Sequence, residues 1–278
     1  MSLTYADPKH SVTGATKRSL VASILLFPVR IAEGVLLVVL SIVIGVPVLV
    51  YLHLFKRDVV TTALTPASLP SIQQQQTQGH VHFKDPVLLQ RAWALPTGQL
   101  YLQGQLEFHR REGYCAPTTL RNVLKSIPSV PLELIPEAKA GPLTAQQFKT
   151  KLDAIGHTTS TLVYGGAGYD LFLSAIKRSN DPHYRVAMNF LHPALFGMDG
   201  PSFLPHVMLL AILGGHFSNI IAYLETEDLV VVFDVNQDFG PYLVPSKRVY
   251  DAVRAIDVQS GVARALVVSE LVHKPRQV

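Results

Sequence analysis

The longest apolar run of the chain lies near its N-terminus, at residues 34–55. It holds 22 residues without a single Asp, Glu, Lys or Arg. A helix of this length extends about 33 Å at 1.5 Å per residue, which is enough to cross the hydrocarbon core of a bilayer. No face of such a helix carries a polar stripe, and the run is longer than the apolar core of a signal peptide. We therefore expect a transmembrane helix at 34–55, preceded by a segment 1–33 that contains a shorter apolar stretch.

The charges beside this helix do not fix its orientation. Within about 20 residues of its ends, three basic residues, Lys17, Arg18 and Arg30, lie before it, and two, Lys56 and Arg57, lie after it. A difference of one basic residue is too small for the positive-inside rule to orient the helix. The sequence therefore predicts a single-pass membrane protein and leaves open which side of the membrane carries the rest of the chain.

The part that follows divides by its hydrophobic pattern into a linker and one domain. Residues 56–83 are rich in Thr, Pro, Ser and Gln and show no apolar periodicity, so we expect a linker there. Residues 84–278 are enough for one well-buried domain and too few for two.

Helical patterns come first in this domain, and strand patterns dominate later. Apolar residues recur at helical spacing from Cys115 to Ile127. A capping box, Thr144 with Gln147, opens a helix that we expect to end at Gly156. The remaining predicted elements are helices at 169–178 and 246–255 and strands at 186–190, 207–213, 217–223, 229–235 and 263–268. This order predicts an α+β domain in which the first helix packs on an antiparallel sheet.

Cys115 is the only cysteine of the chain, and it stands where the first of these helices begins. Pro117 supports this start, because proline is tolerated in the first turn of a helix. Unpaired N–H groups and the positive end of the helix dipole favour the thiolate, which is the reactive form of cysteine. On this segment alone, a nucleophile and a buried structural cysteine are equally good interpretations.

A predicted hairpin supplies a base and an acid for that nucleophile. His216 lies at the start of one strand and Asp234 at the end of the next, with a polar turn about Glu225 between them. Folding the hairpin about Glu225 sets His216 opposite Asp234, within reach of an imidazole–carboxylate hydrogen bond. Taken one at a time, a core histidine and a strand-end aspartate are the ordinary interpretations. Together with Cys115 they predict a Cys-His-Asp triad.

These segments resemble the phytochelatin synthase family, papain-like enzymes that act on glutathione. The resemblance rests on Tyr114-Cys115 and its helix, on Gly215-His216-Phe217-Ser218, and on Asp234-Val235, which follow in the family's order and nearly its spacing. It is specific over residues 106–127 and 186–255. It implies a papain-like cysteine peptidase fold in which Cys115, His216 and Asp234 serve as nucleophile, general base and orienting acid.

Three positions depart from the family pattern. Six residues before the cysteine, where the family has an oxyanion-stabilising glutamine, this chain has His109. Where the family has substrate-facing arginines, this chain has His192, in a segment that includes Asn189, and Gln237. The resemblance thus implies an oxyanion role for His109 and substrate contacts for Asn189, His192 and Gln237. Histidine and glutamine hold carboxylates less well than arginine does, so we expect weak glutathione binding. An ordinary half-buried polar role explains His109 and His192 at least as well.

The resemblance implies a membrane-anchored thiol hydrolase or transpeptidase that cleaves an amide bond of glutathione or a related thiol peptide. No tightly bound cofactor is expected, and a metal ion would enter as a thiolate complex of the substrate. The bilayer is a partner through 34–55, whereas a net charge of +4 without an arginine-rich stripe argues against nucleic acid. Two alternatives remain: a papain-like peptidase acting on peptides or proteins, and a catalytically inactive membrane adaptor with the same fold.

Overall fold

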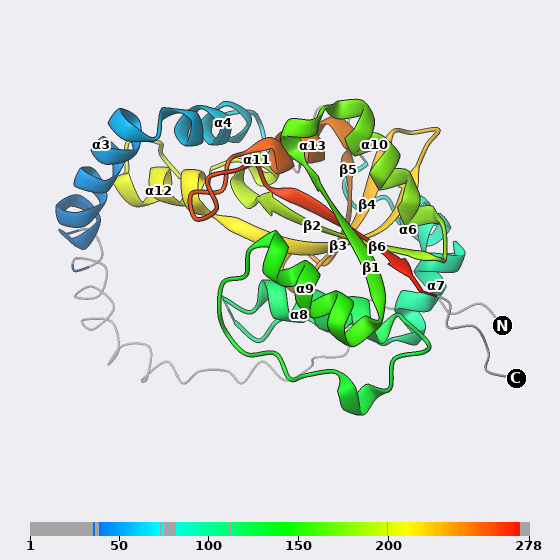
Figure 1. The fold of residues 1–278 in the computed structure, drawn as a ribbon. Coiled ribbons are helices and arrows are strands. Elements are labelled where there is room, and N and C mark those ends of the chain that lie inside the picture. The colour runs from blue at the N-terminus through cyan, green and yellow to red at the C-terminus, as the bar shows by residue number, and fades with distance from the viewer. Residues whose placement is uncertain are drawn as a thin grey trace, which may run out of the picture.

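A computed structural model of the chain describes residues 36, 39–72, 74, 82–111, 113–198 and 200–272. Its centre is a six-stranded antiparallel sheet with the strand order β1-β6-β2-β3-β4-β5 (Figure 1). The strands are β1 Thr158–Tyr164, β2 Tyr184–Leu191, β3 Gly215–Leu224, β4 Leu229–Asp234, β5 Pro241–Pro245 and β6 Ala265–Leu271. The predicted combination of helices with an antiparallel sheet is confirmed.

Helices cover both faces of the sheet (Figure 1). One face packs against α8 (Cys115–Lys125) and α9 (Ala145–Gly156), and farther along against α6 (Pro86–Trp93) and α7 (Pro96–Gln103). The other face packs against α10 (Tyr169–Lys177), α11 (His192–Phe196) and α13 (Ser246–Arg254). Successive strand residues point to opposite faces. Ile220 therefore packs with the helices α10, α11 and α13, and Ile221 packs on the other face with α6 and α7. Short 3-10 turns η3 (Leu132–Leu134), η4 (Gly165–Ala167) and η5 (Arg178–Asn180) join these elements.

Most of the predicted helix starts are confirmed, and their local chemistry explains them. The capping box at α9 is complete, with the Thr144 hydroxyl accepting from the Gln147 N–H. The helix ends at Gly156 as predicted, and the residue that follows it, His157, has a left-handed backbone conformation. At α6, a helix that the sequence did not predict, the Asp85 carboxylate caps the N–H groups of the first turn.

The N-terminal segment differs from expectation. Its described part is divided between a π-helical turn, η2 (Ser41–Gly45), and the ten-residue α-helix α3 (Val46–Phe55). Among the residues that the structure describes, no helix is both long and apolar enough to cross a membrane, so a transmembrane helix at 34–55 is not found. Residues 34, 35, 37 and 38, and all of segment 1–33, lie outside the described ranges.

Part of the predicted linker 56–83 is helical and belongs to the core. Residues Arg57–Ala67 form α4, which packs against α11, α12 and α13. Val59, Val60 and Ala63 are buried in the main core cluster. The linker prediction rested partly on the threonines of this segment. Their hydroxyls instead donate to helix carbonyls one turn earlier, as the Thr61 hydroxyl does to the Arg57 carbonyl.

The strand predicted at 207–213 is wrong, because Pro205–Leu213 form the helix α12. A short apolar run does not distinguish a strand from a buried helix by periodicity alone. Pro205 at the first helical position is the local signal that favours the helix. The strand predicted at 217–223 is β3, which begins two residues earlier, at Gly215.

Candidate active site

The helix that begins at Cys115 is held against the strand that carries His216. Cys115 is the first residue of α8, and α8 packs on β3. The Thr119 hydroxyl, one turn after the cysteine, donates to the Phe217 carbonyl over 3.0 Å. The Asn219 side chain donates back to the Thr119 carbonyl over 3.3 Å. These buried bonds place the start of α8 beside the start of β3, where His216 lies.

His216 and Asp234 meet on one face of the hairpin, although the predicted register is wrong. Ser218, and not His216, lies directly opposite Asp234. The turn is centred later in the chain than residue 225, and the ladder shifts between Ile220 and Ala222. A displacement of two residues keeps a side chain on the same face, so His216 is the diagonal neighbour of Asp234. Its Nε2 lies 2.8 Å from the Asp234 Oδ1.

Asp234 is fully buried, and both of its carboxylate oxygens accept hydrogen bonds. Oδ1 faces the His216 ring and also accepts from the backbone N–H of Asn236 at 2.8 Å. Oδ2 accepts from the Ser218 hydroxyl at 3.1 Å. The carboxylate is therefore fixed in place, and by engaging Nε2 it leaves the Nδ1 of His216 for the Cys115 thiol.

The three side chains shift one another's pKa values toward an ion pair. Burial by itself would raise the pKa of the Cys115 thiol, but the hydrogen bond and the charge of His216 lower it below its ordinary value. Burial would lower the pKa of His216, but the charge and hydrogen bond of Asp234 raise it to about 10. Burial would raise the pKa of Asp234, and His216 lowers it. These shifts favour a thiolate–imidazolium pair beside a carboxylate.

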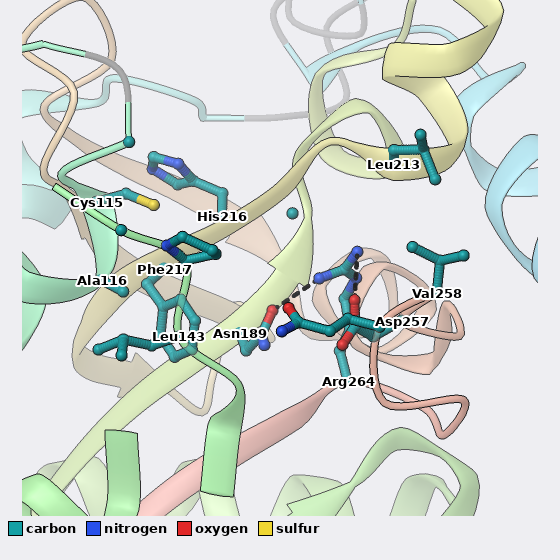
Figure 2. Close-up of a pocket in the computed structure, with 15 residues that line it drawn as sticks. Cys115, Ala116, Leu143, Asn189, Leu213, His216, Phe217, Asp257, Val258 and Arg264 are labelled. Atoms are coloured by element: carbon teal, nitrogen blue, oxygen red, sulfur yellow. Dashed lines mark hydrogen bonds and ion pairs between the residues drawn. The ribbon is translucent and has the colours of Figure 1, made fainter. Parts of the chain in front are cut away.

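The thiol and the imidazole line a cleft with a volume of about 330 Å³ (Figure 2). This volume lies within the usual range for small-molecule sites. Leu143 and Phe217 form an apolar wall near the cysteine, and Leu213 and Val258 lie at the opposite side (Figure 2). In the part of the chain that the structure describes, no three His, Cys, Asp or Glu side chains come together to hold a metal ion.

Arg264 supplies a guanidinium to this cleft, and sequence reasoning missed it. Its Nη1 donates to the Asn189 Oδ1 over 3.0 Å, and its Nη2 lies 3.7 Å from the Asp257 Oδ1 (Figure 2). Burial lowers the pKa of Arg264, while Asp257 and Cys115 oppose that shift. Arg264 lies at the edge of the predicted strand 263–268, where it resembled an ordinary flanking charge. No local motif indicated that the fold would bring it to the cysteine.

Asn189 is thus placed in the cleft, whereas the other predicted binding residues are not among its lining residues. Gln237 is exposed in the turn that follows Asp234. His109 is half-buried, with its backbone N–H bonded to the Val235 carbonyl and its ring centre 6.5 Å from that of His216. His109 therefore lies beside the imidazole of His216.

His192 belongs to an aromatic cluster behind the imidazole. Its ring stacks on Phe196 with a centre-to-centre distance of 4.5 Å and contacts Phe239 edge-on at 4.7 Å. Burial and the nearby positive charge of His216 lower the pKa of His192 to about 4, so this ring is neutral at physiological pH. The structure therefore packs His192 against the ring of His216, 5.3 Å away between centres, and His192 is not among the residues that line the cleft.

Comparison with protein families identifies a match within the same region. Residues 208–266 match the model of the family described as phytochelatin synthase. The matched part includes His216, Asp234 and Arg264, and it lies C-terminal to Cys115. No curated protein matches the chain significantly. This match supports the resemblance to the phytochelatin synthase family over residues 208–266.

Proposed function

We propose that this protein is a thiol hydrolase or transpeptidase of phytochelatin synthase type. It cleaves the amide bond between cysteine and glycine in glutathione, or the equivalent bond of a related thiol peptide. Cys115 acts as nucleophile, His216 as general base and then acid, and Asp234 as the group that orients the imidazole. We also propose that the domain has a papain-like fold, with the nucleophile helix α8 on the sheet that bears the base.

One observation carries the substrate proposal: a matched pair of charges lines the same cleft as the thiol. Arg264 and Asp257 present a guanidinium and a carboxylate there, 3.7 Å apart at their nearest atoms. The γ-glutamyl end of glutathione carries an α-carboxylate and an α-ammonium group on one carbon. Arg264 suits the carboxylate through charge-assisted hydrogen bonds, and Asp257 suits the ammonium. Asn189, which accepts from Arg264, holds the guanidinium in position.

Acylation follows from the ion pair. The thiolate of Cys115 attacks the carbonyl carbon of the scissile amide, and the carbonyl oxygen becomes an oxyanion. The backbone N–H of Cys115 at the start of α8 and the neutral imidazole of His109 are the proposed donors to that oxyanion. The His216 imidazolium then donates its proton to the amide nitrogen as the carbon–nitrogen bond breaks. Glycine leaves, and a γ-glutamylcysteinyl thioester with Cys115 remains.

Deacylation regenerates the thiolate. His216, now neutral, accepts a proton from the incoming nucleophile as that nucleophile attacks the thioester carbonyl. Water gives hydrolysis to γ-glutamylcysteine, and the amino group of a second thiol peptide gives transfer. We favour hydrolysis as the main outcome. A metal ion participates, if at all, as the thiolate complex of the substrate.

Membrane attachment through residues 34–55 is part of this proposal. The segment has no Asp, Glu, Lys or Arg, and within its described part Val43, Leu54 and Phe55 are more than half exposed. Soluble proteins rarely leave a contiguous apolar surface of this kind uncovered.

A papain-like peptidase with a different peptide substrate is the second candidate. The histidine at position 192 and the glutamine at position 237 favour it, because the family uses arginine to hold glutathione carboxylates there. An inactive adaptor is the weakest alternative, since the three catalytic side chains form a hydrogen-bonded array beside a cleft.

Mass spectrometry of reaction products distinguishes these candidates. Full-length protein in detergent is incubated with glutathione, with and without Cd²⁺ or Zn²⁺, and compared with the Cys115→Ala variant. Release of glycine together with γ-glutamylcysteine, or with longer γ-glutamylcysteine polymers, supports the proposal. Unchanged glutathione alongside cleavage of an unrelated peptide by the same preparation would favour the second candidate, and no turnover of any peptide would favour the adaptor.

A further inference from the structure

Exposed apolar side chains concentrate at one end of the molecule. Within the described residues, they occupy η2 and α3 and continue onto α12, which lies beside them (Figure 1). We call this surface the apolar platform. Its members are Val39, Leu40, Ile42, Val43, Ile44, Val46, Val50, Tyr51, Leu54 and Phe55 on the first segment and Phe203, Leu210 and Leu213 on or next to the second.

The two segments form one surface because they pack closely. A Cβ atom at Gly45 would lie 3.3 Å from both the Pro205 Cβ and the Leu209 Cδ1, which is a tight contact. Glycine at this crossing lets the helices approach without a side chain between them. On the inner side of α12, Ala211 and Ile212 are buried, while Leu210 on its outer side is 62% exposed. The platform is therefore a fixed feature of the fold.

The borders of the platform fit a lipid bilayer better than a second copy of the chain. Exposed apolar residues end at Phe55, and two adjacent cations, Lys56 and Arg57, follow at once. Tyr51 and Phe55 form an aromatic pair, with ring centres 5.2 Å apart, just before those cations. Aromatic rings followed by lysine and arginine are typical of the level at which hydrocarbon meets headgroups. A dimer interface would instead favour an apolar stripe with a polar opposite face, and the sequence of 34–55 has no such face.

The platform continues to the cleft. Leu213, the last residue of α12, is 37% exposed and lines the cleft that contains Cys115. Only Gly214 and Gly215 separate it from the proposed base, His216. A surface that fixes α12 on a bilayer therefore also fixes the position of the cleft relative to that bilayer.

We infer that α12, together with residues 39–55, is a bilayer-binding surface that seats the cleft of Cys115 at the headgroup level. This goes beyond anchoring by 34–55, because it gives the catalytic domain its own contact with lipid through Phe203 and Leu210. Its significance for the reaction rests on the proposed function: the cleft then meets peptides that are concentrated at the membrane surface. The lipid contact itself is independent of the chemistry.

Tryptophan placed on the platform measures that contact. Full-length Phe203→Trp and Leu210→Trp variants are reconstituted into phosphatidylcholine–phosphatidylglycerol vesicles whose acyl chains carry bromine, a short-range quencher. The native Trp93 is buried and gives a constant background. Matched controls are Val87→Trp and Leu132→Trp, at positions that are 70% and 69% exposed and lie on elements away from the platform. Fluorescence of the two platform variants should decrease relative to plain vesicles, and fluorescence of the two controls should not.

Two outcomes would overturn the inference. One is vesicle-bound protein in which positions 203 and 210 are quenched no more than positions 87 and 132, since lipid then contacts only the N-terminal segment. The other is protein that does not bind vesicles and forms a dimer as its concentration rises, because a second copy of the chain would then cover the apolar platform. Neither outcome is measured by turnover. An inactive protein whose platform tryptophans are quenched would therefore refute the proposed function and still support the bilayer-binding surface.

Discussion

The hydroxyl of Thr119 donates to the carbonyl of Phe217 over 3.0 Å, and this bond joins the nucleophile helix to the strand of the base. Thr119 lies one helical turn after Cys115, and Phe217 directly follows His216. Both residues of the bond are buried, so water does not compete for it. The relative position of thiol and imidazole therefore depends on a side chain that has no place in the chemistry itself.

Replacing that hydroxyl should reduce turnover more than it reduces folding. Thr119→Val keeps the shape of the side chain but leaves the Phe217 carbonyl without its donor, which costs about 1–3 kcal/mol of stability. Misplacement of the thiol relative to the imidazole should lower kcat by as much as about 10²-fold. Thr119→Ser retains the donor and should restore most of the rate. Two results would make the role of Thr119 merely structural. One is a normal kcat in Thr119→Val. The other is a loss of kcat and a change in the alkylation pH profile that are no larger than the decrease in Tm explains.

Alkylation of the thiol tests the ion pair directly. Iodoacetamide should modify Cys115 near neutral pH, with an inflection below the value of about 8.5 for an ordinary cysteine. The imidazolium of His216 lowers this pKa, so His216→Ala should move the inflection to higher pH and abolish nearly all turnover. Measurement of the alkylation rate against pH provides the check. An inert thiol in the folded protein, or an inflection that His216→Ala leaves unchanged, would contradict the pair.

The carboxylate should control the alkaline limb of the pH–rate profile. Asp234 raises the pKa of His216, to about 10, because it stabilises the charged ring. Activity that needs the imidazolium should be present below that pH and lost as pH rises through it. In Asp234→Asn the stabilising charge is absent, so the alkaline limb should move to lower pH and kcat should decrease while the fold persists. The pH dependence of kcat/KM and the far-UV circular dichroism of both proteins decide this, and an unmoved limb would rule out the orienting role.

Local patterns predicted the helices α8 and α9 and the shared face of His216 and Asp234, and long-range packing explains what they missed. Cys115 and the capping box at Thr144 carry their own helix-start signals, so α8 and α9 could be recognised from neighbouring residues alone. The face shared by His216 and Asp234 survived a wrong register, because strand periodicity tolerates a displacement of two. The cleft position of Arg264 depends on how β6 meets β2 across the sheet. No short segment encodes that pairing.

This missed arginine also changes the expectation about substrate. Weak glutathione binding is the expectation if His192 and Gln237 stand where arginines would face the substrate. Because His192 packs on Phe196 and neither position is among the residues that line the cleft, His192→Arg and Gln237→Arg should have little effect on glutathione affinity. Arg264 already offers the guanidinium that the argument required.

Membrane attachment can be tested by extraction, and the structure changes where the chain should be cut. Full-length protein should sediment with membranes and resist alkaline carbonate, because 34–55 is uninterrupted by charge. A chain starting near Lys84 would also lose α4, whose Val59, Val60 and Ala63 fill the core. Truncation before Arg57 is therefore the matched comparison, and it should bind membranes less tightly while remaining folded. Intact full-length protein in the detergent-free supernatant would contradict the attachment.

Gly215 offers a way to move Arg264 without removing it. A Cβ atom at this position would lie 2.5 Å from the Arg264 Nη1, so Gly215→Ala must displace the guanidinium from Asn189. The guanidinium is the mobile end of a long side chain, and the backbone of β3 accepts alanine, so we expect the fold to persist.

The expected result is a higher KM for glutathione with kcat little changed. Loss of charge-assisted hydrogen bonds to a carboxylate costs roughly 1.5–3 kcal/mol each, which corresponds to about tenfold or more in affinity. Gly166→Ala is the control, because a Cβ there meets nothing within 4 Å. Steady-state kinetics should be combined with the alkylation assay, since Gly215 adjoins His216. An unchanged KM, or an altered alkylation profile that shows a displaced imidazole instead, would refute the assignment of Arg264 to the substrate carboxylate.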